Sequence, residues 1–128
     1  MKKTLLVAAG LICTCQLAFS MSYEEAMLNR FYFEHASVSS EYCERNNFST
    51  ANVLKNWQTK HQSISTGSLR VIRSEMARRG LGKSEQEEVV FNAIEINRST
   101  ARKHNVKKPP LCQRFDLQLK TYSDLMVQ

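Results

Sequence analysis

Apolar side chains recur along four segments of the chain with the spacing of an α-helix, and no segment shows the strict alternation of a β-strand. The four segments cover approximately residues 22–45, 50–79, 84–104 and 109–126. Their apolar stripes run through these positions: Met27, Phe31, Val38 and Tyr42; Val53, Trp57, Ile64, Val71 and Ile72; Val90, Ala93, Ile94 and Ala101; Leu111, Phe115, Leu119, Tyr122 and Met126. The pattern predicts an all-α protein.

Residues that break or cap helices separate these segments. Asn46 and Asn47 interrupt the chain after the first helix. Ser49 or Thr50 is placed to cap the second helix by accepting a hydrogen bond from its free N–H groups. Gly80 is expected to end the second helix, because glycine adopts the left-handed backbone of a helix terminus without strain.

The third helix has the clearest predicted start. Ser84 and Glu87 match the S-x-x-E pattern of a capping box, in which each side chain binds the backbone N–H of the other residue. Pro109 and Pro110 prevent the third helix from continuing and begin the fourth. Because the connections between the helices are short, we expect a single antiparallel, up-down-up-down four-helix bundle.

The first turn also predicts how the first two helices lie against each other. With the turn centred near residues 47 and 48, residue i of the first helix lies beside residue 95 − i of the second. This register pairs large apolar side chains in three layers: Tyr42 with Val53, Val38 with Trp57, and Phe31 with Ile64.

The first twenty residues have the features of a secretory signal peptide. A basic start at Lys2 and Lys3 precedes an apolar run over residues 5–17, and small residues follow it. The run is shorter than the ~20 residues that a membrane span needs. We therefore expect residues 1–20 to be removed and residues 21–128 to fold as a single α-helical domain, either periplasmic or secreted.

Two cysteines remain after such a cleavage, because Cys13 and Cys15 lie within the signal peptide. Neither of these has the small preceding residues of a lipid-attachment site, so a lipid anchor is the weaker alternative. Cys43 and Cys112 are expected to form a disulfide in an oxidising compartment. In an up-down-up-down bundle the end of the first helix and the start of the fourth meet at one pole, which places these two cysteines together.

Composition supports a folded helical protein. Hydrophobic residues make up 42% and charged residues 23% of the 128, as in an ordinary globular chain. Only 4 glycines and 2 prolines are present, which argues against a turn-rich β-fold. Removal of Lys2 and Lys3 leaves 16 basic and 12 acidic residues, a net charge of +4.

Basic side chains concentrate in two clusters. The first cluster is the candidate surface for a partner: Arg70, Arg73, Arg78, Arg79 and Lys83. The second cluster lies toward the opposite pole: Arg98, Arg102, Lys103, Lys107 and Lys108. Cations suit a helix C-terminus, and the remaining charge would attract an acidic protein, a cell-wall polymer or an anionic lipid. Export and the lack of aromatic residues interleaved with basic ones disfavour nucleic acid.

Candidate ligand sites are few. His35, His61 and His104 fall near one level of the predicted bundle, and three imidazoles can bind zinc or copper. The alternative places two of them at the edge of the core and leaves His104 at an exposed helix end. Met27 and Met76 keep haem open, although no C-x-x-C-H motif occurs. No catalytic motif is found, so we expect neither an enzyme nor a cofactor.

These features favour an exported, non-catalytic helical bundle that binds another envelope or secreted protein. One specific form is an immunity or inhibitor protein that neutralises a toxin or hydrolase in the cell envelope. The alternatives are a periplasmic carrier of a metal, haem or small apolar molecule, and a secreted effector. The fold cannot choose among them, because helical bundles serve many unrelated functions.

Overall fold

The computed structural model describes residues 21–128, and within this range it contains helices and no strand. The elements are α1 (Tyr23–Arg45), α2 (Ala51–Lys60), α3 (Gln62–Arg78), α4 (Lys83–Lys107), a 3-10 turn η1 (Cys112–Arg114) and α5 (Phe115–Leu125). The predicted all-α class is confirmed. The predicted signal peptide lies outside the described residues, and no helix between residues 21 and 128 is long and apolar enough to cross a membrane.

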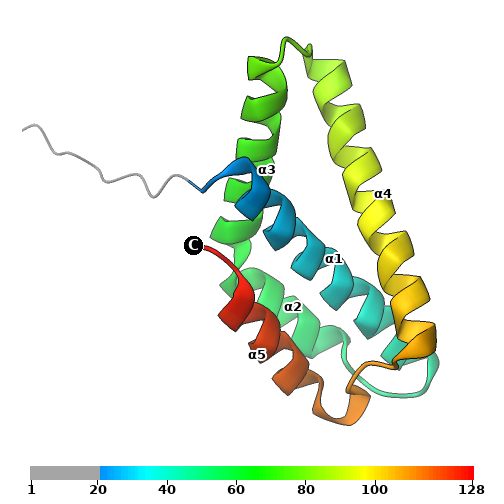
Figure 1. Ribbon diagram of the computed structural model, residues 1–128. Helices are drawn as coiled ribbons and strands as arrows, with labels where there is room; N and C mark the ends of the chain where they lie inside the picture. The colour runs from blue at the N-terminus through cyan, green and yellow to red at the C-terminus, as the bar shows by residue number, and fades with distance from the viewer. Residues whose placement is uncertain (1–20) are drawn as a thin grey trace, which may run out of the picture.

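Helix α1 occupies the centre of the arrangement (Figure 1). Helices α3 and α4 form an antiparallel hairpin whose arms diverge from their tight turn, and α1 crosses between the arms. Helices α2 and α5 lie side by side, close to the end at which α3 begins. As a result α1 packs against each of the other four α-helices.

Because of this central position, no residue of α1 from Asn29 to Cys43 is exposed, whereas Leu28 nearer its start is 43% exposed. Ala26 and Ala36 are fully buried, and their small side chains let neighbouring helices approach closely. Polar residues of the same helix are buried as well: Asn29, Arg30, Glu34, His35, Ser39 and Ser40. Val38 of the predicted apolar stripe is 1% exposed, whereas Met27 and Phe31 are only partly buried. The single stripe was therefore an incomplete description of a helix that has neighbours on all sides.

The buried polar groups of α1 form hydrogen bonds with distant parts of the chain. The Asn29 side-chain N–H donates to the Val127 carbonyl at 2.7 Å, and the Val127 N–H donates back to Asn29 Oδ1 at 2.9 Å. Asn105 of α4 donates to Ser39 Oγ at 3.3 Å. Because a buried polar group without a partner is costly, these pairs fix the positions of the C-terminal tail and the end of α4 on α1.

The helix predicted over residues 50–79 is divided in two at His61, so the expectation of one continuous helix was wrong. Trp57 Nε1 donates to Ser123 Oγ at 2.8 Å, and His61 Nε2 lies 3.0 Å from the same oxygen. A side chain of α2 and the side chain at the break itself therefore both bind α5. The change of direction lets α2 pack against α5 while α3 packs against α4.

The apolar core has two parts. The first lies where α1, α2 and α5 meet: Phe33, Ala36, Cys43, Trp57, Phe115, Leu119 and Met126, which directly follows α5. The second lies where α1, α3 and α4 meet: Ala26, Ile72 and Val90. Trp57 packs against Phe33, with ring centroids 5.0 Å apart, and Val38, its partner in the layer prediction, is not part of this cluster.

Two hydrogen bonds nevertheless join residues that the predicted register pairs. Arg30 Nη1 donates to Ser65 Oγ at 2.7 Å, and Gln58 Nε2 donates to Ser37 Oγ at 3.3 Å. One bond lies on each side of the break at His61. The register of the first two predicted helices was therefore close to correct, even though the second helix is not continuous.

Both predicted turns are present, and Gly80 has the predicted left-handed backbone, with a φ of 91°. Asn47 in the first turn is also left-handed, with a φ of 65°. At the end of α3 the Gly80 N–H donates to the Ala77 carbonyl at 2.9 Å, and the Leu81 N–H donates to the Met76 carbonyl at 3.0 Å. These bonds occupy carbonyl groups that the helix end would otherwise leave free.

The N-termini of α2 and α4 are capped differently from the prediction. Thr50 makes no side-chain bond to α2, and Glu44 Oε1 instead accepts from the N–H groups of Thr50 and Ala51 at 2.5 and 2.7 Å. At α4 the Gly82 N–H donates to Glu85 Oε2 at 2.9 Å. The predicted Ser84–Glu87 capping box is absent, because the N-cap of α4 is Gly82, two residues before Ser84, and the helix begins at Lys83.

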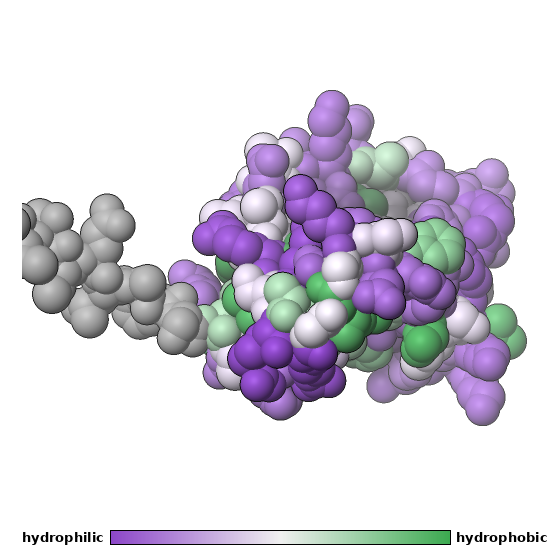
Figure 2. All heavy atoms as spheres, turned by 90° about the horizontal axis from the view of Figure 1, so that it is seen from above, coloured by the Kyte–Doolittle hydropathy of each residue, from purple (hydrophilic) through white to green (hydrophobic). Residues whose placement is uncertain are grey.

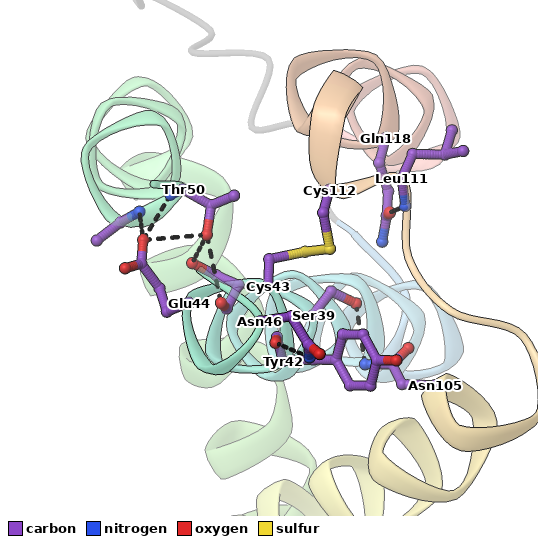
Figure 3. The surroundings of a disulfide bond; sticks show 12 residues. Ser39, Tyr42, Cys43, Glu44, Asn46, Thr50, Asn105, Leu111, Cys112 and Gln118 are labelled. Carbon is purple, nitrogen blue, oxygen red and sulfur yellow. Dashed lines mark hydrogen bonds between the residues drawn. A yellow bond between two sulfur atoms is a disulfide. The ribbon is translucent and has the colours of Figure 1, made fainter. Parts of the chain in front are cut away.

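The predicted disulfide between Cys43 and Cys112 is confirmed, with the Cα atoms 5.3 Å apart. It joins the last part of α1 to η1, as Figure 3 shows. The two residues are 69 positions apart in the sequence, so the bond closes a long loop.

Replacement of Trp57 tests the α1–α2–α5 core. Trp57→Ala should lower the free energy of unfolding by about 3–5 kcal/mol, because it leaves a cavity beside Phe33. Trp57→Phe keeps most of the volume and loses the bond to Ser123, so its loss should be about 1 kcal/mol. Denaturant unfolding measures both. An alanine variant within 1 kcal/mol of wild type would contradict the packing.

Loss of the disulfide should destabilise the protein by roughly 4 kcal/mol, because the bond restricts a long loop of the unfolded chain. The double variant Cys43→Ala, Cys112→Ala measures this loss in the same unfolding experiment. Mass spectrometry after alkylation gives the control: the wild-type protein should take up no alkylating agent at these residues until it is reduced.

Candidate functional site

Buried ion pairs account for part of the second basic cluster. Glu34 Oε1 lies 2.5 Å from Arg30 Nη2, and its other oxygen lies 3.4 Å from Arg98 Nη1. Arg98 also pairs with Glu41. Arg98 therefore connects α4 to α1 from a position that is 20% exposed, and it is not a free cation for a partner.

The first basic cluster is also largely paired within the chain. Arg73 forms two bonds to Glu87 of α4, from Nε at 2.6 Å and from Nη2 at 3.1 Å. Arg78 and Arg79 both bind Glu75, with shortest distances of 2.6 and 3.0 Å. These guanidinium groups lower the pKa of the Glu75 carboxyl to about 2. Within residues 21–128 only two members of the cluster lack an ion pair, namely Arg70 and Lys83.

A mainly apolar pocket of about 420 Å³ lies beside the disulfide, and we call it the disulfide pocket. Its walls come from the end of α1, the first turn and the segment before α5: Tyr42, Phe48, Pro109, Pro110, Leu111 and Arg114. Leu111 is 59% exposed. Gln118 holds this segment in place by accepting a hydrogen bond from the Leu111 N–H at 2.9 Å (Figure 3).

Basic residues stand next to the pocket walls in the sequence. Arg45 precedes Asn46, and Lys107 and Lys108 precede Pro109. All three cations are exposed, and none forms an ion pair within the described part of the chain. The nearby Glu44 is held by backbone N–H groups, from Ala51 first and then Thr50, and these bonds lower the pKa of its carboxyl. Three exposed cations without an ion pair in the described range therefore directly precede segments that line the disulfide pocket.

The three histidines do not meet in one place. His35 and His104 lie together, with ring centroids 5.8 Å apart, whereas His61 contacts Trp57 and Ser123. Burial, and secondarily the charge of His104, lowers the pKa of His35. Burial, and secondarily Lys60, lowers the pKa of His61. Among residues 21–128 there is no group of three or more His, Cys, Asp or Glu side chains placed to hold a metal ion.

The two methionines proposed for haem lie in packed regions. Met76 is 4% exposed, and Met27 packs against the core formed by α1, α3 and α4. Elsewhere, seen from the α3–α4 turn, hydrophilic side chains cover most of the surface and apolar ones are scattered among them (Figure 2). The disulfide pocket combines aromatic and aliphatic residues with one basic residue, Arg114, which forms an exposed ion pair with Asp116 at 3.5 Å.

Sequence reasoning singled out neither Phe48 nor the pocket. Tyr42 was assigned to the core stripe, and Pro109 and Pro110 were interpreted only as a helix boundary. The available signal was the pair Cys43 and Cys112, because a bond between them brings the flanking aromatic residues and prolines together. Comparisons with protein-family models, with curated proteins and with solved structures found no match.

Acid titration tests the pairing of the first basic cluster. Since the pKa of Glu75 is lowered from 4.5 to about 2, its contribution to stability is present above pH 4.5 and is lost as the pH falls toward 2. Glu75→Gln should therefore be less stable than wild type above pH 4.5, with the difference shrinking toward pH 2. Thermal unfolding at several pH values measures this.

The control for this titration is Glu95→Gln, because Glu95 is an exposed carboxylate of α4 without an ion pair in the described range. Its profile should follow that of wild type. A Glu75→Gln profile parallel to wild type from pH 6 to pH 2 would contradict the role of Glu75.

Proposed function

We propose that the protein is exported with the help of residues 1–20 and acts in the periplasm or outside the cell as a non-catalytic, protein-binding helical domain. In this proposal it functions as an antiparallel bundle that is closed by one disulfide. The specific form that we favour is an inhibitor or immunity protein that neutralises an acidic toxin or hydrolase of the cell envelope.

The disulfide pocket is the observation that carries this proposal. Centres of protein interfaces are rich in aromatic residues and arginine, and an anchoring side chain of one partner often fills a pocket of the other. Tyr42, Phe48 and Arg114 supply such residues around a pocket of about 420 Å³. Leu111 adds an apolar side chain that is 59% exposed and therefore available to a partner.

Rigidity supports a binding role as well. A surface that is already ordered before association loses less conformational entropy when it binds. The disulfide attaches Cys112 to α1, and Gln118 of α5 binds the backbone of Leu111. The segment that forms one wall of the pocket is thus held at two points, although it belongs to no α-helix.

Charge supports an acidic partner. Arg45, Lys107 and Lys108 directly precede segments that line the pocket and have no ion pair in the described range, so a partner's carboxylates could approach them without displacing internal bonds. Charges at the rim of an interface mainly accelerate association and make it sensitive to salt. In contrast, Arg73, Arg78 and Arg79 would first have to leave Glu87 and Glu75. Because these three arginines of the first basic cluster are already paired, we propose the disulfide pocket as the binding surface in place of that cluster.

Site-specific photocrosslinking tests the proposal. A photoreactive amino acid at position 111, in the protein expressed in its native cells, should give one discrete adduct with another protein after illumination. Changing Lys107 and Lys108 to Glu in the same background should weaken that adduct, because it reverses the charge beside the pocket.

The matched control places the same photoreactive residue at position 96. Ile96 lies on α4 outside the pocket and is 66% exposed, comparable to Leu111. It should give no discrete adduct. Equal crosslinking from both positions, or none from position 111, would contradict a binding surface at the disulfide pocket.

A further inference from the structure

His35 of α1 and His104 of α4 face each other across the contact between these helices. Their ring centroids are 5.8 Å apart. His35 is 6% exposed, whereas His104 is exposed to solvent. A buried imidazole and an accessible imidazole are therefore neighbours at a point that solvent reaches from one side.

The buried ring has an unused nitrogen. His35 Nε2 is shielded from solvent and has no hydrogen-bond partner among the described residues. Buried polar side-chain atoms are nearly always paired, because an unpaired one loses its interaction with water without replacement. The neighbouring aromatic rings of Phe31 and Tyr122, with centroids 4.2 and 6.5 Å away, pack around the imidazole, and neither residue forms a hydrogen bond with this nitrogen. His35 Nε2 is therefore free to bind a ligand from outside the chain.

The spacing of the two rings agrees with that of two ligands on one metal ion. Two imidazole nitrogens bonded to one ion at about 2.0–2.1 Å hold their ring centroids roughly 5–6 Å apart. From this spacing and the unpaired Nε2 we infer that His35 and His104 form a two-imidazole site for a divalent first-row transition metal. Water fills the remaining coordination positions on the exposed side of His104.

The surroundings of the pair keep the two helices at this separation. Asn105, which follows His104, donates to Ser39 Oγ at 3.3 Å, one helical turn after His35. Arg98 pairs with Glu34, the residue before His35. These contacts fix α4 against α1 on both sides of the histidines, so the separation of the two helices is set before a metal ion binds.

The ligand set defines the kind of site. No third His, Cys, Asp or Glu joins the pair within residues 21–128, which excludes a closed four-ligand structural zinc site among these residues. A site with two protein ligands and water is open and exchangeable. Imidazole ligands suit copper, nickel and zinc, and copper(II) binds most tightly in this series, so copper(II) is the probe of choice. This inference does not rest on the proposed protein-binding function.

Copper(II) titration of the purified protein, expressed from the full chain, tests the site. Wild type should bind one equivalent saturably, with an electron paramagnetic resonance spectrum that shows coupling to imidazole nitrogen. Binding to the folded state should also raise the midpoint of thermal unfolding. His104→Gln should lose all three effects, and because His104 is exposed this change should leave the fold intact.

The third histidine provides the matched control. His61→Gln should keep the copper binding, the spectrum and the thermal shift of wild type, because His61 lies against Trp57 and Ser123. Absence of saturable binding in wild type would overturn the inference, as would wild-type binding by His104→Gln. Loss of binding in His61→Gln as well would also overturn the two-histidine site.

Discussion

The rest of the structure depends on the burial of polar side chains along α1. Along the middle of this helix little surface is left for solvent, so its polar residues depend largely on partners from other segments. Glu34 binds Arg98 of α4, Arg30 binds Ser65 of α3, and Asn29 binds the backbone of Val127. Apolar contacts hold the helices together without direction, whereas these paired groups specify which segment lies where.

Ion pairs within the chain also distinguish basic residues that stabilise the fold from those that are still free to bind a partner. A high local density of basic residues in the sequence does not by itself identify a binding surface, because carboxylates from other helices can neutralise it. Glu75 and Glu87 do so for Arg78, Arg79 and Arg73. Lys107 and Lys108 have no such partner in the described range, and in the sequence they directly precede Pro109 in the wall of the disulfide pocket.

The disulfide pocket and the histidine pair both lie toward the C-terminal end of α4 but use different chemistry. The pocket offers apolar contact, with basic residues next to its walls in the sequence, and the histidine pair offers two nitrogen donors. A protein partner would contact Leu111 and these basic residues, while a metal ion needs only His35 and His104. The two proposals can therefore succeed or fail independently of each other.

The sequence alone determined features that depend on residues close together in the chain. These include the helical period, the turns at Asn47 and Gly80, and the two cysteines available to pair. Even here a local signal was overlooked, because Ser22 and Glu25 form the capping box of α1. Only the tertiary structure decided the break at His61, where no proline or glycine stands and Ser123 of α5 supplies the partner. The tertiary structure also decided that Arg98 and Arg73 form ion pairs with carboxylates of the same chain, and that His104 lies beside His35. Each of these contacts joins residues that are distant in the sequence and meet only when the helices pack.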